Sequence, residues 1–485
     1  MANKLKTANK KPNWFVRTGR GIKEWFVDFG KRFQDGSIGT KISHFIFGAG
    51  NLYHGQIIKG LLYLVLQVGI ILFMVLCPEV NHTPYGWKAL VNLKLGGSEG
   101  GEFDPMTGEM TLPSDDKLRL LFGLVTIAII IIFILLWLSN IKSSYKADMD
   151  VKQGKKPTTF VDDLKELLDT RFHLLMLTPT MVAALVFTLL PTIFMICMAF
   201  TTYNDFDMNA KGTVLFHWNG FNNFIYMFSG QSQLGVELKA RFLPVFGWTI
   251  IWAIFATFTC YFGGIILAIL INKKGLKGKK VFRTLFILTI AIPQFISLLA
   301  VRNLLGTYGP INSLIKAFGW SNNSIGFLGL ADGDSEILAK VMVIIVNMWL
   351  GIPYTMLMTS GILMNIPADL YEAGTVDGAS KTKMFFKITL PYVIFITTPY
   401  LISSFVGNIN SFNTIFLLTG GGPGYSGYKA GGTDLLVTWL YKLTIENGEY
   451  NTGAVIGILT FIITATITLI TYTRSKAFNE EDTFQ

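Results

Sequence analysis

The chain has 485 residues, of which 51% are hydrophobic and only 15% are charged. Soluble domains carry about 25% charged residues, so this composition excludes an ordinary soluble protein. The formal net charge of +10 would suit a nucleic-acid-binding surface only if the basic residues gathered on one face, and here they stand beside long apolar runs. The sequence therefore predicts a membrane protein with no nucleic-acid partner.

The N-terminal segment 1–55 is basic and contains no long apolar run, so no cleavable signal peptide is expected. Apolar side chains recur there at helical spacing between basic ones: Trp14, Ile22, Trp25, Phe26, Phe29 and Phe33. This pattern predicts an amphipathic helix that lies on the inner leaflet and contacts membrane lipid. The same periodicity also fits a helix packed on a partner subunit.

Eight later segments are long and apolar enough to cross a hydrocarbon core of about 30 Å as helices. They are residues 57–77, 118–138, 174–200, 243–271, 285–305, 337–363, 392–418 and 453–472. Pro293 and Pro353 mark expected kinks within two of them. The predicted fold class is an all-α polytopic membrane protein with eight transmembrane helices.

The distribution of Lys and Arg predicts the orientation. With a cytoplasmic N-terminus, the inside segments hold 28 basic residues and the outside segments hold 7. Because basic residues resist translocation, we expect both termini in the cytoplasm. The expected organisation is a cytoplasmic segment 1–55, two spans within 56–138, a cytoplasmic linker 139–172, six spans within 173–473 and a cytoplasmic tail 474–485.

The sequence offers no catalytic or metal-binding constellation. Cys77, Cys197 and Cys260 lie within or beside apolar segments, and the five histidines are scattered singly. No G-x-x-x-x-G-K-[ST] phosphate loop occurs. We therefore expect no metal, no cofactor and no enzymatic activity, and any ATP that powers this protein must bind another polypeptide.

Two predicted spans carry neutral polar residues at helical spacing. Ser404, Asn408 and Ser411 fall at i, i+4 and i+7, and an earlier span carries Asn347, Gly351 and Tyr354. Such faces either bond one helix to another or line a hydrated route. The residues alone favour neither interpretation, but the absence of carboxylates from both faces favours a neutral, hydroxyl-rich ligand over an ion.

The predicted cytoplasmic loop 364–391 contains the signals of two short helices. Pro367 suits the first turn of one helix, Gly378 suits a turn with positive φ, and Ser380 is a plausible N-cap of the next. Leu370, Ala373 and Val376 are then available to enter a groove on a partner.

This loop resembles the EAA motif of the membrane subunits of bacterial ATP-binding-cassette (ABC) importers. The matching residues are Glu372-Ala373-Gly374, Gly378 and Ile388-x-Leu390-Pro391, with Gly374 in place of the second alanine. The resemblance implies the type I importer permease fold and a coupling helix that docks on an ATP-binding subunit. It assigns this coupling to Glu372, Ala373, Gly374, Asp377 and Gly378, with Glu372 pairing with a basic residue of that subunit.

Residues 173–473 further resemble the larger permease subunit of maltose/maltodextrin importers. The resemblance is carried by residues 349–354 (WLGIPY), 404–408 (SFVGN), 418–423 (LTGGGP) and 431–437 (GGTDLLV). It implies a midplane sugar site formed by Leu350, Gly351, Tyr354, Ser404, Asn408 and Ser411. This chain departs from that subunit at Gly407 and Ser411, and it lacks the large outside domain between the third and fourth spans.

The resemblance implies a permease subunit in a bacterial plasma membrane that imports maltodextrin-type oligosaccharides. Its expected partners are a second, homologous permease subunit, two copies of an ATP-binding subunit and an extracellular solute-binding protein. Other oligosaccharides, such as galactosides, are an alternative substrate. An ion-coupled secondary transporter and a membrane glycan-processing enzyme fit the sequence less well, because intramembrane charges and catalytic clusters are not evident.

Overall fold

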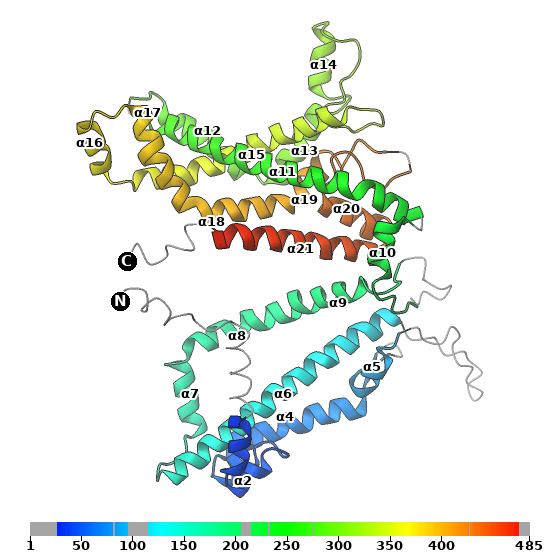
Figure 1. Cartoon of the computed structure of the whole chain (residues 1–485), viewed down its shortest axis with the longest axis vertical. Helices are drawn as coiled ribbons and strands as arrows, with labels where there is room; N and C mark the ends of the chain where they lie inside the picture. Colours follow the sequence, from blue (N-terminus) through cyan, green and yellow to red (C-terminus); the bar gives the residue numbers. More distant parts are fainter. Residues whose placement is uncertain are drawn as a thin grey trace, which may run out of the picture. The chain divides into compact units, whose positions relative to one another are not determined.

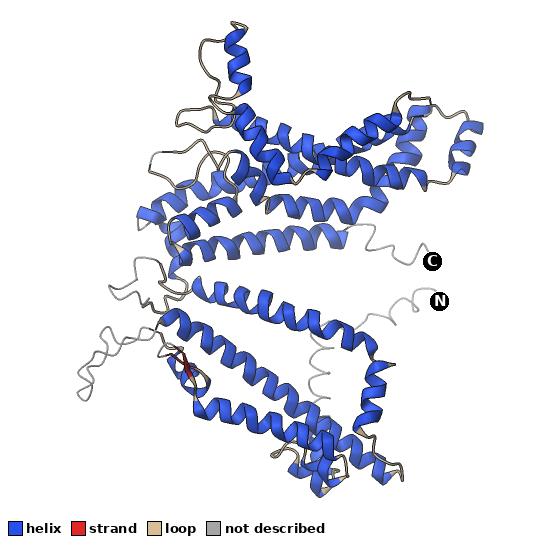
Figure 2. Cartoon of the chain, turned by 180° about the vertical axis from the view of Figure 1, so that it is seen from behind, coloured by secondary structure: helices blue, strands red, loops and turns tan. Residues whose placement is uncertain are grey.

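The computed structural model describes residues 27–80, 83–95, 115–204, 215–230, 233–273, 275–425 and 427–474. These residues are almost entirely helical (Figure 2), and their only sheet is an antiparallel pair of two-residue strands, β1 (Glu79–Val80) and β2 (Thr83–Pro84). Most of the predicted N-terminal amphipathic helix lies outside the described residues, but residues 27–34 are helical.

The chain forms two compact units. The first comprises Met1–Met195 and Asp207–Trp218. Its helices are α2 (Ile38–Ile42), α3 (Ala49–Tyr53), α4 (Ile57–Leu76), α5 (Gly86–Asn92), α6 (Asp116–Lys152), α7 (Phe160–Leu168), α8 (Phe172–Ala184), the π-helical turn η1 (Leu185–Leu189) and most of α9 (Leu190–Met198). Buried hydrogen bonds join the connection between α2 and α3 to α6. The Asn140 side chain on α6 accepts a hydrogen bond from the Gly48 amide and donates one to the Ser43 carbonyl.

The second unit comprises Ile196–Phe206 and Asn219–Gln485. Its helices are α10 (Asn222–Ser229), α11 (Gln233–Asn272), α12 (Lys279–Ala291), α13 (Gln294–Leu305), α14 (Pro310–Ala317), α15 (Glu336–Met364), α16 (Ala368–Val376), α17 (Lys381–Met384), η3 (Phe385–Thr389), α18 (Leu390–Ile409), α19 (Phe412–Leu418), α20 (Leu436–Tyr441), η4 (Lys442–Glu446) and α21 (Tyr450–Arg474). Helix α11 packs against α15 and α18, and α18 packs against α21 (Figure 1).

Seven helices in the described residues are long and apolar enough to span a membrane, and the count becomes eight if one bent pair forms a single span. That pair is the predicted fifth span, which breaks between α12 and α13 with a bend of 95°. Pro293 explains the break, because it lacks an amide donor and pushes Ile292 into an extended conformation (ψ 127°). Helix α15, by contrast, continues through Pro353.

The seventh span begins and ends earlier than expected, over Lys381–Ile409 instead of 392–418. Helix α18 ends at Ile409, and Ser411 is the N-cap of the separate helix α19. The prediction that Ser411 shares a helical face with Ser404 and Asn408 is therefore wrong. Residues 407–411 (GNINS) are weak helix formers, and their short polar side chains favour helix ends over helix interiors.

Helices α11 and α15 approach closely through glycine. A Cβ atom at Gly264 would overlap the Thr355 side chain, and one at Gly351 would lie 2.6 Å from the sulfur of Cys260. In lipid, such close contact between backbones replaces the hydrophobic driving force that joins helices in water. Two indoles add hydrogen bonds nearby, from Trp248 to the Thr433 carbonyl (3.1 Å) and from Trp252 to the Asn408 carbonyl (3.1 Å).

Candidate functional site

Helices α11, α15 and α18 enclose a cavity of about 160 Å³ in the second unit. Its walls are polar but uncharged, with no Lys, Arg, Asp or Glu among the described residues that line it. The lining residues are Ala256, Thr257, Cys260, Tyr261, Asn347, Gly351, Tyr354, Thr355, Tyr400, Leu401, Ser404 and Asn408.

Four of the six residues expected to bind sugar line this cavity: Gly351 and Tyr354 from α15, and Ser404 and Asn408 from α18. Asn347, one turn before Gly351, lines it as well. The other two lie elsewhere. Leu350 packs against the core cluster around Trp252. Ser411 is at the N-cap position of α19, and its hydroxyl donates to that of Thr414 at 3.3 Å.

The third wall of the cavity, formed by α11, was not predicted from the sequence. Thr257, Cys260 and Tyr261 come from α11, at i, i+3 and i+4. This spacing was readable as a polar stripe within an apolar span. Tyr400, one turn before Ser404 on α18, extends the face that was predicted.

Hydrogen bonds fix the polar side chains of the cavity. The Asn408 amide donates to the Thr257 hydroxyl at 2.9 Å and so joins α18 to α11. The Asn347 amide points to the sulfur of Cys260 at 3.4 Å and joins α15 to α11. The rings of Tyr354 and Tyr400 face each other with centroids 6.1 Å apart. Neutral donors and acceptors beside two phenol rings suit a ligand with hydroxyl edges and apolar faces.

A second candidate site is the turn between α16 and α17. The Gly378 amide donates to the Thr375 carbonyl at 3.0 Å, and the next amide, of Ala379, donates to the Gly374 carbonyl at 2.9 Å. These two bonds form a Schellman motif, which requires the positive φ of 72° at Gly378. The predicted glycine turn is confirmed.

The helices on either side of this turn have clear ends. Pro367 is the N-cap of α16, one position earlier than expected, and Asp377 is its C-cap. Ser380 caps α17, as predicted, by accepting a hydrogen bond from the Lys383 amide at 3.2 Å. The loop therefore presents one short helix, α16, which the Gly378 turn joins to a long helix that runs from Lys381 through η3 and α18 to Ile409. The prediction of a second short helix is wrong, because α17 is the first turn of the seventh span.

Helix α16 is tied to the chain on one side and exposed on the other. The Tyr371 hydroxyl lies 2.8 Å from that of Thr389, and a Cβ at Gly374 would reach Met384 and Ile388 at 3.4 Å, an ordinary contact. An alanine, as the EAA motif has, would thus fit at Gly374. Glu372 and Ala373 are exposed, as are Asp377 and Gly378.

The apolar residues of α16 are also exposed. Leu370 is 44% exposed and Val376 is 88% exposed. Among the described residues, the Glu372 carboxylate has no hydrogen-bond or ion-pair partner. An exposed carboxylate next to exposed apolar side chains is a combination suited to docking.

Comparison with known proteins assigns this chain to a family. Residues 260–479 match the binding-protein-dependent transport system inner membrane component. The chain is 30% identical to the galactooligosaccharides transport system permease protein GanP of Bacillus subtilis (strain 168), over 90% of this chain and 96% of that protein. It is 32% identical to the maltodextrin transport system permease protein MalC of Streptococcus pneumoniae (strain TIGR4), over 90% and 95%.

A third relative matches over a shorter region. The maltose/maltodextrin transport system permease protein MalF of Escherichia coli (strain K12) is 38% identical over 52% of this chain and 48% of its own length. Among solved structures, the chain resembles a bacterial ABC transporter involved in the import of the acidic polysaccharide alginate. That match has a TM-score of 0.51 at 21% identity and covers 64% of this chain and 98% of the other, which shows the fold.

The matched family supplies the inner membrane component of its transport systems. These matches therefore locate this protein in the membrane and assign ATP hydrolysis to a separate subunit. This chain belongs to the binding-protein-dependent transport system inner membrane components, the multi-pass permease subunits of ABC importers in the plasma membrane.

Proposed function

We propose that this permease carries oligosaccharides of the maltodextrin type. The observation that carries the proposal is the uncharged cavity between α11, α15 and α18, with its amides, hydroxyls and paired tyrosines. The relatives named for maltodextrin support this substrate. Galacto-oligosaccharides are the second candidate, since GanP matches over a similar length.

A second, homologous permease subunit is proposed to complete the sugar site. The cavity of about 160 Å³ is smaller than the roughly 300–1,000 Å³ of typical ligand pockets. One of its lining residues, Tyr354, is 54% exposed in this chain. The three helices thus form one side of a binding site and leave the other side open to a partner.

The turn at Gly378 is proposed to couple transport to ATP. Glu372, Ala373, Gly374, Asp377 and Gly378 would contact one of two copies of an ATP-binding subunit. The turn would then lie in the cytoplasm, and the proposed orientation with both termini inside, which puts 28 basic residues on the inside segments, supports this. The proposed six-span core 173–473 then delivers sugar from an extracellular solute-binding protein, and spans one and two are accessory.

Alternating access requires differential affinity. ATP binding and the loaded solute-binding protein must both stabilise the outward-open state relative to the inward-open state, because a ligand that binds both states equally shifts nothing. The exposed face of α16 is where ATP-driven closure would act on this chain.

Substrate competition tests the proposal. Cells that depend on this chain should take up labelled maltodextrin, and excess unlabelled maltodextrin should compete more strongly than excess galacto-oligosaccharide. The reverse order would replace maltodextrin with galactosides as the substrate, and uptake of neither sugar would contradict an oligosaccharide permease.

Replacing Asn408 with Leu should lower uptake at limiting sugar by about tenfold or more, because the change removes neutral donors and acceptors from the cavity and leaves Thr257 without its partner. Thr398→Val is the matched control on α18, since the Ile394 carbonyl of its own helix is the one hydrogen-bond partner of the Thr398 hydroxyl within the described part of the chain. Assembly of the complex should be normal in both variants. Wild-type uptake by Asn408→Leu would show that this amide only joins helices.

Replacing Gly378 with Val should reduce uptake more than replacing it with Asn. The site has a φ of 72° and nothing within 4 Å of an added Cβ, so the penalty is conformational rather than steric. Asn tolerates this left-handed region, whereas a β-branched residue strongly resists it. Uptake should be compared at equal amounts of protein in the membrane. Equal uptake by the two variants would contradict a role for the turn angle.

A further inference from the structure

Two adjacent cavities lie in the first unit, at the end of α6 that follows its apolar stretch. The first, of about 440 Å³, lies between the helical segment 27–34 and α6. The second, of about 430 Å³, extends toward α4 and α7. Both are lined by Ser139 and Lys142. Each volume falls within the range of ordinary ligand sites.

These cavities have a surplus of positive charge. In the second cavity, Lys59 is paired with Asp163, and Arg171 with Glu166 at 2.9 Å. The other cations that line the two cavities are Arg32, Lys142 and Lys146, and none of them forms an ion pair with a described residue. Asp28 contributes one opposing carboxylate to the first cavity. An anion is therefore the expected ligand.

The position along α6 places the cavities at headgroup level. No charged residue lies between Arg119 and Lys142, a stretch of 22 residues. At about 1.5 Å per residue this stretch spans about 33 Å, which matches the hydrocarbon core. Trp137, just before the cavity residues, donates its indole N–H to the His44 carbonyl at 2.8 Å. Tryptophan is typical of the membrane–water interface.

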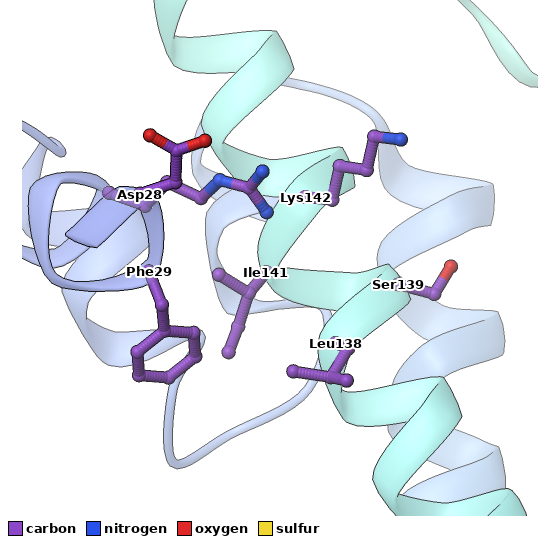
Figure 3. Close-up of a pocket in the computed structure, with 7 residues that line it drawn as sticks. Asp28, Phe29, Leu138, Ser139, Ile141 and Lys142 are labelled. Atoms are coloured by element: carbon purple, nitrogen blue, oxygen red, sulfur yellow. The ribbon is translucent and has the colours of Figure 1, made fainter. Parts of the chain in front are cut away.

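In the first cavity, the apolar and the charged side chains lie on different sides. Figure 3 shows Phe29, Leu138 and Ile141 grouped together, with the charged ends of Asp28 and Lys142 away from them. Lys146 follows Lys142 by one helical turn, and Ser143 lines the second cavity between them. An amphiphilic anion, with a phosphate beside an apolar part, matches this division better than a free anion does.

We infer that the two cavities bind the phosphate headgroup of an anionic phospholipid. Lys142 and Lys146 attract the phosphate, and the Ser139 and Ser143 hydroxyls donate to its oxygens. Phe29 and Leu138 cover the glycerol and the start of an acyl chain. Free inorganic phosphate shares the chemistry of the headgroup, but it would make no contact with the apolar side chains of the first cavity. This site does not depend on which sugar the permease carries.

Binding of short-chain lipids to the purified full-length chain in detergent tests the inference. Dioctanoyl phosphatidylglycerol should bind, and dioctanoyl phosphatidylcholine should bind much more weakly. The double variant Lys142→Gln/Lys146→Gln should weaken phosphatidylglycerol binding by about thirtyfold, as expected for the loss of two lysines near a lipid headgroup. Lys142→Arg/Lys146→Arg keeps the charge and should bind nearly as well as the parental chain.

The matched control is Lys155→Gln/Lys156→Gln, which removes the same charge from exposed positions outside both cavities and should not change binding. Equal affinity of the two Gln double variants would overturn the site. Inorganic phosphate at millimolar concentration should not displace the lipid. If it does, the site belongs to a free phosphate, and the lipid assignment is wrong.

Discussion

Sugar uptake is expected to fall to background when Glu372 is replaced by Lys. The Glu372 carboxylate is exposed on α16 and has no partner among the described residues, so its loss should not disturb the fold of this chain. A lysine there would face the basic residue that the EAA resemblance assigns to the ATP-binding subunit. Like charges brought together at an interface cost several kcal/mol, enough to prevent docking.

The measurement is uptake together with the amount of ATP-binding subunit that co-purifies with the permease. Asp169→Lys is the matched control, a charge reversal at the exposed C-cap of α7 where a cation is tolerated. The Glu372→Lys chain should insert into the membrane normally but lose the ATP-binding subunit. Normal uptake by this variant would remove Glu372 from the coupling contact.

The membrane-spanning helices were predictable because lipid imposes a length and a composition on every span. Only tertiary contacts decide whether a span is continuous, and the prolines were ambiguous for this reason. Pro293 breaks the fifth span, whereas Pro353 lies within a continuous α15. Both prolines were expected to kink a helix, and the sequence around them did not reveal which would end it.

Two walls of the cavity between α11, α15 and α18 were predicted, and the third was not. Helical spacing along α15 and α18 identified Gly351, Tyr354, Ser404 and Asn408, because residues one turn apart share a face. Spacing within one helix carries no information about which other helix faces it. The contact of Asn408 with Thr257 on α11, 151 residues away along the chain, is a product of packing.

The turn between α16 and α17 was the element best predicted from the sequence, because its signals are local. A positive φ at Gly378 and a side-chain cap by Ser380 depend on a few neighbouring residues. Ser411 was expected within the seventh span, but it lies at the start of α19. The run of weak helix formers from Gly407 was a local signal that α18 ends early, but it was outweighed by the apolar length of the segment.

The second large effect is expected at Asp434, which is fully buried. Its carboxylate accepts hydrogen bonds from the Gly431 amide (2.7 Å) and the Thr438 hydroxyl (2.9 Å), and it pairs with Lys442 at 2.7 Å. A Cβ atom at Gly421 would overlap this carboxylate, so Asp434 lies directly against the glycine-rich segment 418–423. Without Asp434, the mostly buried Lys442 would be an uncompensated charge.

Replacing Asp434 with Ala should therefore lower the free energy of unfolding by about 3–5 kcal/mol, as is typical when one partner of a buried ion pair is removed. Glu449→Ala is the matched control: its pair with Lys429 is longer, at 3.5 Å, and Lys429 is 30% exposed, so the loss should be about 1 kcal/mol or less. The double variant Asp434→Ala/Lys442→Ala should recover part of the lost stability, because it leaves no unpaired charge. Thermal unfolding of the purified chain in one detergent measures all three, and equal midpoints for Asp434→Ala and Glu449→Ala would show that the buried pair does not hold this loop.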